Sequence, residues 1–431
     1  MDRLVGSVQR YAWGDPAFIP RLQSRPVTGD PEAELWFGAH PVAPSRLERS
    51  GAMLDELVGA DPEAVLGPAV ARRFGRFPFL VKVLAAAEPL SIQAHPSLAQ
   101  ARAGHQREEA AGIPWDSPRR TYRDDNHKPE LLAALTPFEA KCGFRPLSET
   151  RHLVDLVSSA CPTPALAELR SRLDGSPTGA VDPRAAPGDR ATVAAVVGWL
   201  LGLAPEAAGP LAANAVAACE KLLAGAVPAE AEPFEAEIRW TRRLDRYHPG
   251  DAGVVVALLL NHVVLAAGEA VYLEAGNLHA YLRGAGVEVM ANSDNVVRGG
   301  LTTKHVDAPG LLSILDTEPA PAPVQAPAGT RHHYQVPAPE FSLTRLSGPG
   351  GSGGVEAMEG PAGPEIVLVT EGRVVLAAAA APPIELGPGE AALVTPADGP
   401  YRIEVREPGV RWRAGVGAHA GPGDEPAGAA R

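Results

Sequence analysis

The sequence predicts a mainly β fold that is interrupted by an α-helical insertion. Two stretches of the chain, at about residues 1–146 and from about 246 onward, carry short strand-forming runs separated by turn residues. Between them, apolar residues recur at the three- and four-residue spacing of amphipathic helices. The 45 Gly and 44 Pro residues agree with many turns between short strands.

Residues 1–146 are predicted to form the first part of a β domain. A typical strand in this part is Pro78–Leu84, an apolar run bounded by turn residues. Residues 147–245 are predicted to be helical, because their apolar positions have a period near 3.6. The positions that carry this pattern are Leu153, Leu156, Val157, Leu166, Leu169, Leu173, Val193, Val196, Val197 and Leu200.

The strand pattern returns in residues 246–317, which are predicted to complete the first β domain. Residues 318–414 are predicted to form a second, C-terminal β domain. Its first residues, 318–330, are rich in Pro and Ala and form a linker or an extended loop. Residues 415–431 are rich in Gly, Ala and Pro without apolar periodicity, so a disordered tail is predicted.

Composition excludes several classes of function. The 51 acidic residues exceed the 39 basic ones, which argues against a nucleic-acid partner. The N-terminus lacks the apolar core of a signal peptide, and the most apolar stretch, residues 253–268, is too short to span a bilayer. The three cysteines form no CxxC pair and are odd in number. A cytoplasmic protein without a membrane partner is therefore predicted, and the sequence leaves open a monomer or a homodimer.

The segment Leu90–Pro96 contains a Gln-x-His pair. On a strand, Gln93 and His95 point to the same side, which is how a barrel strand offers two metal ligands to its interior. An edge strand with one polar face would show the same pattern.

A second polar segment, Asp124–Glu130, groups five ionisable side chains around a proline. A solvated turn is the simplest interpretation. Glu130, however, enters the apolar run Leu131–Leu135, where an unpaired carboxylate is costly and a metal ion would be a suitable partner.

Two further segments complete the set of motifs. Gly268–Leu282 is similar to the second cupin motif, a Gly, a short strand and then Pro-x-Gly-x-x-His, with Glu274 in place of the Pro. Gly276 would make the tight turn and His279 would point into the barrel, although a core histidine remains an alternative. The segment 288–304 combines Asp, Arg and Lys with glycines, as a sugar-phosphate site requires, and a charged surface loop is its alternative.

Together these segments resemble the type I phosphomannose isomerase family, in order and approximate spacing, from the N-terminus to about residue 317. The resemblance implies cupin-type, jelly-roll β-barrels. Residues 318–414 resemble only a degenerate further cupin, in which no His follows the Pro396–Tyr401 turn. The segments that carry the resemblance are Tyr11–Gly14, Glu34–Pro41, Phe79–Lys82, Ser91–Pro96, Asn126–Glu130, Gly276–Leu282 and Ser293–Lys304.

The resemblance implies a zinc site. Gln93, His95, Glu130 and His279 match the zinc ligands of the family. Two imidazoles, an amide and one carboxylate would leave about one net positive charge on one Zn²⁺ per chain. A nitrogen and oxygen ligand set with room for substrate is typical of catalytic zinc.

The implied reaction interconverts D-mannose 6-phosphate and D-fructose 6-phosphate through a cis-enediol. Arg298 matches the active-site arginine, and Lys128, His127 and Asp294 match residues for proton transfer or ring opening. A lysine near zinc and arginine loses its proton more easily, which makes Lys128 a candidate base. Further candidates for substrate contacts are Ser91, Lys82, Lys304, Tyr281, Glu288 and Trp13.

Two other functions stay open at this point. One is a metal-binding cupin that acts on another sugar phosphate or on another substrate. A dioxygenase would favour a His-rich iron site, which the Gln93 and His95 pair does not resemble. The other is a non-catalytic sugar-binding cupin, although each ligand position and Arg298 carry the expected residue type.

Overall fold

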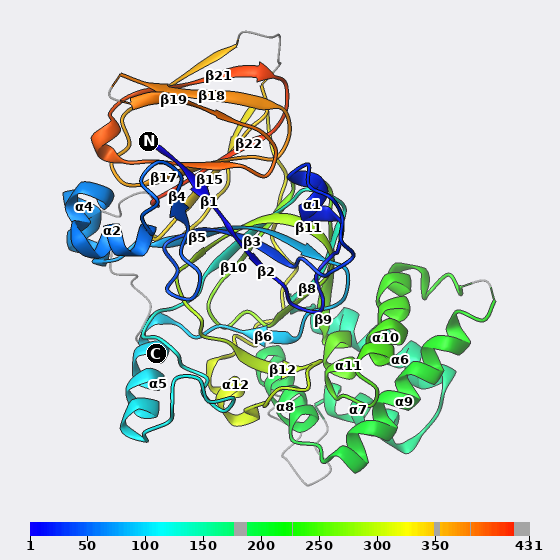
Figure 1. The fold of residues 1–431 in the computed structure, drawn as a ribbon. Coiled ribbons are helices and arrows are strands. Elements are labelled where there is room, and N and C mark those ends of the chain that lie inside the picture. The colour runs from blue at the N-terminus through cyan, green and yellow to red at the C-terminus, as the bar shows by residue number, and fades with distance from the viewer. Residues whose placement is uncertain (176–187, 226, 349–353, 380, 418–431) are drawn as a thin grey trace.

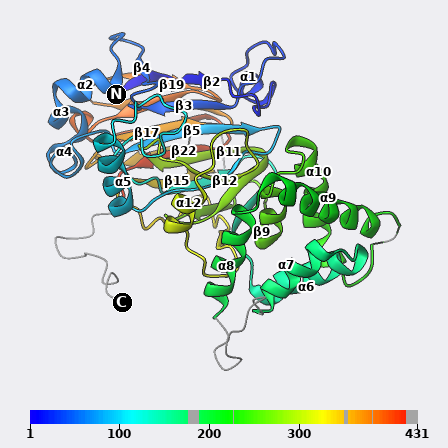
Figure 2. The same ribbon diagram turned by 90° about the horizontal axis from the view of Figure 1, so that it is seen from below.

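The computed structural model describes residues 1–175, 188–225, 227–348, 354–379 and 381–417. Figure 1 shows three parts: a central β-barrel, a second β-barrel above it, and a helical lobe below and to one side. Figure 2, seen from below, shows the helical lobe projecting from one end of the central barrel. We call these parts the first barrel, the C-terminal barrel and the helical lobe.

The first barrel is built from an 11-stranded sheet that folds back on itself through its longest strand, β11 (His279–Ala291). The second half of β11 pairs with β5 and β7, and its first half pairs with β6 and β8. The change occurs near Gly284, whose φ is 120° and whose Cβ would lie 2.6 Å from the Pro137 carbonyl oxygen. The remaining strands are β2 (Ser7–Gln9), β3 (Glu34–Gly38), β5 (Phe79–Ala86), β6 (Ile92–Ala94), β7 (Glu130–Ala134), β8 (Phe138–Phe144), β9 (Leu260–Leu265), β10 (Ala270–Leu273), β12 (Val297–Gly300) and β13 (Val324–Gln325).

The C-terminal barrel consists of a seven-stranded sheet, in the order β14-β15-β22-β17-β20-β1-β4, facing a four-stranded sheet, in the order β16-β21-β18-β19. Apolar side chains from both sheets fill the space between them, among them Val367, Val374, Leu376 and Ile403. The strands are β1 (Asp2–Val5), β4 (Arg46–Leu47), β14 (Arg331–His333), β15 (Ser342–Leu346), β16 (Val355–Met358), β17 (Glu365–Val369), β18 (Arg373–Ala378), β19 (Ala381–Leu386), β20 (Ala391–Val394), β21 (Tyr401–Glu407) and β22 (Arg411–Gly415).

The two barrels share a hydrophobic core. Phe37 and Val81 on the outer face of the first barrel pack with Ile366, Leu393 and Trp412 of the seven-stranded sheet. Because β1 and β4 pair within that sheet, the N-terminus is also part of the C-terminal barrel. The barrels are therefore two sheets packed face to face, and each needs the other to bury its apolar surface.

The helical lobe packs beneath the strands β6 and β12. Its helix α6 (Leu147–Ala160) buries Leu153, Val154 and Val157 at helical spacing, in one cluster with Ile92 of β6. The lobe therefore supports these two strands from outside the barrel. The other helices of the lobe are α7 (Pro164–Leu173), α8 (Asp189–Leu201), α9 (Pro205–Leu222), η1 (Glu232–Phe234) and α10 (Glu235–Tyr247).

The remaining helices connect strands. Among the described residues, no single helix is long and apolar enough to cross a membrane, and one strongly bent pair, α8 with α9, meets the length and composition criteria only together. The connecting helices are α1 (Phe18–Leu22), α2 (Leu54–Ala60), α3 (Pro62–Leu66), α4 (Pro68–Phe74), α5 (Leu98–Ala110), α11 (Gly253–Val256), η2 (Ala257–Leu259), α12 (Ala308–Ile314) and η3 (Pro396–Asp398).

The predicted fold class, cupin-type β-barrels with a helical insertion, is confirmed. Helix and strand are nearly equal in amount, 31% and 29%, because the insertion is large. Most of the predicted tail lies outside the described residues, and the part that is described, 415–417, includes the end of β22. The cysteines Cys142, Cys161 and Cys219 are free thiols, two of them buried.

A buried lysine lies between the first barrel and the helical lobe. Lys141 of β8 is 2% exposed and is opposite His262 of β9. Among the described residues no carboxylate lies within ion-pair distance of Lys141. Burial, with a smaller contribution from the Arg145 guanidinium, lowers the pKa of Lys141 to about 7.

Replacing Lys141 with Met is expected to stabilise the protein by about 3–5 kcal/mol at pH 6.5. The unfolded chain holds the lysine proton up to about pH 10.5, whereas the folded chain releases it near pH 7. The destabilisation that buried Lys141 causes in the wild-type protein is thus complete below pH 7 and disappears toward pH 10.5. Urea unfolding of wild type and variant at pH 6.5 and 9.5 measures it, with the exposed Lys221→Met as control. An equal effect at both pH values would contradict the prediction.

Candidate active site

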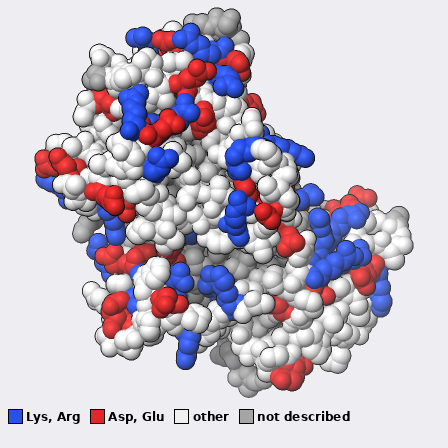
Figure 3. Space-filling view, in the orientation of Figure 1, with Lys and Arg blue, Asp and Glu red and all other residues white. Residues whose placement is uncertain are grey.

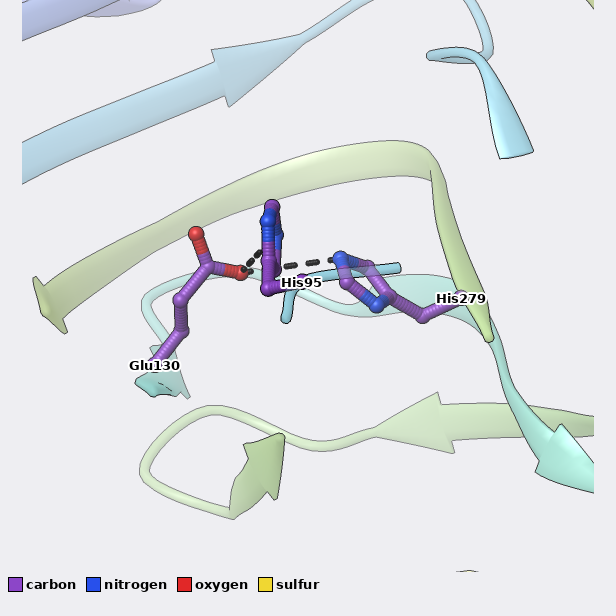
Figure 4. A group of neighbouring side chains, drawn as sticks. All are labelled: His95, Glu130 and His279. Atoms are coloured by element: carbon purple, nitrogen blue, oxygen red, sulfur yellow. Dashed lines mark ion pairs between the residues drawn. The ribbon is translucent and has the colours of Figure 1, made fainter. Parts of the chain in front are cut away.

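Three side chains converge inside the first barrel (Figure 4). His95 follows β6, Glu130 begins β7 and His279 begins β11. The Nε2 atom of each histidine lies 3.5 Å from Oε2 of Glu130, and all three residues are at most 2% exposed. Three strands that are far apart in sequence thus bring one nitrogen or oxygen atom each to the same point.

Backbone carbonyls fix the orientation of both imidazoles. Nδ1 of His95 lies 2.7 Å from the carbonyl oxygen of Asn295, and Nδ1 of His279 lies 3.0 Å from that of Asn277. A carbonyl can only accept, so each Nδ1 carries a proton and each Nε2 presents a lone pair. Burial lowers the pKa of both histidines, that of His279 to about 4, so both rings are neutral at neutral pH.

The chain around the two histidines is held by local structure. Ser97 makes a capping box with Gln100 at the start of α5, two residues after His95. Gly276 has a φ of 80°, and a Cβ there would lie 2.7 Å from the Ile314 carbonyl oxygen. The chain can make this turn before His279 because the residue is glycine.

The geometry of this group fits a metal ion. Nε2 of both histidines and Oε2 of Glu130 are buried and have no hydrogen-bond partner among the described residues. Such unsatisfied atoms are costly unless another group pairs with them. Donors at about 2.1 Å from a tetrahedral metal lie about 3.4 Å from one another, close to the observed 3.5 Å. The three atoms could therefore hold a metal such as zinc.

Gln93 lies next to this group in the sheet. It is directly opposite His279 of β11 on one side and Arg298 of β12 on the other. Opposite residues of an antiparallel pair project to the same face, so these three side chains share one face of the sheet. Gln93 is thus positioned to add an amide oxygen beside the imidazole of His279.

Lys128 is the nearest cation to the group. Its Nζ lies 3.1 Å from Oε1 of Glu130, the carboxylate oxygen that does not face the histidines. Burial alone would raise the pKa of Glu130, but Lys128 and the two imidazoles outweigh it and hold that pKa well below its usual range. Glu130 is therefore an anion that bridges Lys128 and the two histidines.

A buried ion cluster forms another wall of the site. Lys82 of β5 lies 2.9 Å from Glu288 and 3.6 Å from Glu34, and Tyr281 donates a hydrogen bond of 2.9 Å to Glu288. Trp36 donates to Glu34 and lies under the Lys82 ammonium. The two carboxylates outweigh burial and raise the pKa of Lys82 above its usual value, so its charge is retained.

Three other cations lie near one another: Arg123, in the segment before β7, Arg298 of β12, and Lys304, which follows β12. Among the described residues, none of them has an ion-pair partner. Burial lowers the pKa of both Arg298 and Lys304, and repulsion from the neighbouring cations lowers it further. Figure 3 shows acidic and basic residues interspersed over the face in view, so an anion must be attracted by a local cluster of this kind.

Asn295 joins the loops that carry these residues. It is fully buried, and its side-chain oxygen accepts hydrogen bonds from the backbone of Arg123 at 2.7 Å and of Asp124 at 3.2 Å. Its side-chain nitrogen donates to the carbonyl oxygen of Asn126 at 2.8 Å. Since its own carbonyl oxygen accepts from His95, one residue fixes a histidine of the metal group and the segment that leads to Glu130.

Comparison with known proteins agrees with this site. Residues 1–147 match the family model described as phosphomannose isomerase type I, catalytic domain. The chain is 38% identical to the mannose-6-phosphate isomerase of Escherichia coli (strain K12), covering 80% of this chain and 83% of that protein. The chain belongs to the mannose-6-phosphate isomerase family. The Arabidopsis thaliana mannose-6-phosphate isomerase 1 is 31% identical over 96% of this chain and 94% of that protein.

Solved structures of the family superpose on nearly all of this chain. A crystal structure of zinc-bound mannose 6-phosphate isomerase superposes with a TM-score of 0.81 at 34% identity, covering 97% of this chain and 99% of that chain. A mutant of the phosphomannose isomerase from Salmonella typhimurium gives a TM-score of 0.82 at 34% identity. The helical lobe and the C-terminal barrel are therefore part of the shared architecture as well as the first barrel.

The remaining residues predicted from the family lie in different places. Ser91 precedes β6, and Trp13 stacks on Tyr11 at 5.7 Å between ring centroids. Asp294 lies between β11 and β12, with 26% of its side chain exposed. His127 is separate from the metal group: its Nε2 lies 2.7 Å from Oε1 of Glu340, in the segment before β15.

Four residues in or beside the site were not predicted: Glu34, Arg123, Asn295 and His40, whose Nε2 lies 3.5 Å from Oδ1 of Asp294. Glu34, His40 and Asn295 lie inside segments that resemble the family, so the motifs contained the signal. Arg123 is adjacent to a charged run that looks like a solvated turn. Its place beside Arg298 depends on tertiary contacts that no local pattern encodes.

Proposed function

We propose that the chain is a zinc-dependent isomerase that interconverts D-mannose 6-phosphate and D-fructose 6-phosphate through a cis-enediol. The observation that carries the proposal is the set of three buried, unpartnered donor atoms of His95, Glu130 and His279, in a chain of this family. Gln93 is the fourth protein ligand in the proposal. Zinc held there supplies a Lewis acid that polarises the sugar carbonyl and orients the sugar oxygens.

Proton transfer is assigned to the residues around the metal group. Lys128 is our candidate for moving the proton between C2 and C1, because it projects from the same segment as Glu130. Asp294 is the candidate for ring opening. His127 stays a weaker candidate, since its pairing with Glu340 favours a role in joining the two barrels.

Binding of the negatively charged substrate is assigned to Arg298, Lys304 and Arg123. Arg298 meets the negative charge that develops on the enediolate, and Lys304 with Arg123 binds the phosphate. Lys82 is less suited to phosphate, because Glu34 and Glu288 already neutralise it. Lys82, Glu288 and Tyr281 instead present donors and acceptors for sugar hydroxyls, with Ser91 and Trp13 as further contacts.

These assignments give each segment of the chain a proposed role. Residues 1–146 and 246–317 carry the chemistry, residues 147–245 support β6 and β12, and residues 318–414 stabilise the first barrel. The pairing of β1 and β4 with the C-terminal sheet makes the first boundary approximate. We propose a cytoplasmic enzyme, active as a monomer or a homodimer.

The test is a coupled assay that converts fructose 6-phosphate to a measured product, with metal analysis of the same sample. We expect turnover of mannose 6-phosphate and about one zinc per chain, both lost on chelation and restored by zinc. Turnover of another sugar phosphate alone would favour the alternative metal cupin. Sugar-phosphate binding without turnover in the zinc-loaded protein would favour a binding protein.

A further inference from the structure

His40 is a buried histidine beside the site to which the proposed mechanism assigns no role. It lies two residues after β3 and is 3% exposed. Its ring meets Trp36 edge to face, with 4.9 Å between centroids. Nε2 of His40 lies 3.5 Å from Oδ1 of Asp294, on the loop between β11 and β12. A ring held in this way points one nitrogen at a candidate acid–base group.

The position of the proton on His40 follows from its other nitrogen. Nδ1 accepts a hydrogen bond of 3.3 Å from the backbone N–H of Val42. An acceptor nitrogen carries no proton, so the proton of the neutral ring is on Nε2 and faces Asp294. The N–H of His40 therefore faces the carboxylate, with Nε2 3.5 Å from Oδ1 of Asp294.

Burial, helped by two nearby lysines, keeps the His40 ring neutral. Burial lowers its pKa, and Lys82 and Lys128 lower it further, whereas Asp294 and Asp124 oppose the shift. A neutral donor holds a carboxylate without cancelling its charge.

Asp294 has few other restraints. Its backbone N–H donates to Asp124 at 2.7 Å, which fixes the loop but leaves the carboxylate free to rotate. Among the described residues, His40 is the one side chain that pairs with this carboxylate. Tyr11 is another titratable group that lies close enough to sense Asp294. The direction of the carboxylate thus depends on His40.

We propose that His40 is a positioning residue that holds the carboxylate of Asp294 toward the bound sugar. The inference rests on the proposed function. In ring opening, the carboxylate takes the proton of the C1 hydroxyl as the bond from C1 to the ring oxygen breaks, and it returns a proton to that oxygen. The carboxylate is ionised before and after the step. The rate of ring opening therefore depends on its position between the two oxygens and not on a lasting change in its charge.

The test compares two amides at position 40. In His40→Gln the side-chain NH₂ reaches about as far as Nε2, whereas in His40→Asn it reaches only about as far as Nδ1. We expect His40→Gln to keep at least half of kcat, and His40→Asn to lose roughly tenfold. Both should keep wild-type zinc content and nearly unchanged KM.

The pH profile and a double variant separate positioning from stability. Loss of the N–H that faces Asp294 should move the acidic limb of kcat upward in His40→Asn, because a donor dipole pointed at a carboxylate favours its ionised form. Adding His40→Asn to Asp294→Asn should cost less than twofold, because the residue acts through Asp294.

Three results would overturn the proposal: equal losses in His40→Gln and His40→Asn, a tenfold further loss in the double variant, or loss of zinc from His40→Asn. Unchanged kcat in His40→Asn would overturn it too. Wild-type protein is assayed first with mannose 6-phosphate, and its inactivity when zinc-loaded would reject the proposed function rather than the role of His40.

Discussion

Replacing His279 with Ala is expected to remove tight zinc binding and, with it, more than 99% of turnover. The imidazole provides one of the three buried donor atoms of the metal group. The Nε2 atoms of His95 and His279 each lie 3.5 Å from Oε2 of Glu130, and all three atoms lie within 4.8 Å of one another. Loss of an outer-shell partner already costs about 10–100-fold, and loss of a ligand must cost at least as much. Zinc per chain, measured after dialysis at neutral pH, should fall from about one to near zero.

A matched control comes from the helical lobe. His248→Ala removes a histidine that directly follows α10 and is not part of the metal group, and it should keep both zinc and activity. Thermal unfolding with and without added zinc completes the test, because zinc should raise the unfolding temperature of wild type but not of His279→Ala. Full zinc occupancy and normal turnover in His279→Ala would show that the ligand assignment is wrong.

The helical insertion could be predicted because its signal is local. Leu153 and Val157 of α6 and Leu166, Leu169 and Leu173 of α7 are all buried, as their spacing requires. Helical periodicity reports which side of a segment is buried, whatever it packs against.

The pairing of β1 with β20 could not be predicted in this way. Residues 2–5 are a short strand with no partner nearby in sequence, and their hydrogen bonds go to Ala391–Leu393. Which strands are neighbours depends on packing of the whole sheet, not on the composition of either strand. Residues 2–5 therefore belong to the C-terminal sheet, although they begin the segment 1–146 that is predicted to form the first β domain.

The sequence indicated part of the metal group but not the ion cluster around Lys82. Alternation along one strand placed Gln93 and His95 on one side, but only the resemblance to the family joined them with Glu130 and His279. Lys82 lies in a strand that is otherwise apolar, and its partners Glu34 and Glu288 come from strands far away in sequence. Local pattern cannot show that a buried charge is paired.

Replacing Arg298 with Ala is expected to lower kcat by about a hundredfold or more and to leave zinc content unchanged. Arg298 shares a face of the sheet with Gln93 and has no ion-pair partner among the described residues, so its charge is available to substrate. A guanidinium placed to meet charge that develops only in the enediolate contributes mainly in the transition state. KM should therefore change much less than kcat.

The alternative is that Arg298 holds the phosphate in the ground state. In that case KM would rise steeply while kcat stayed near normal, which is the result of losing uniform binding. Lys304→Met is the comparison variant, because Lys304 is assigned to phosphate and should show this second pattern. Arg239→Ala, on the exposed face of α10, controls for the loss of a positive charge. Steady-state kinetics with mannose 6-phosphate, with zinc measured on each sample, distinguishes the two roles. If Arg298→Ala changed KM alone, the role of Arg298 would be phosphate binding, and no guanidinium would be assigned to the enediolate.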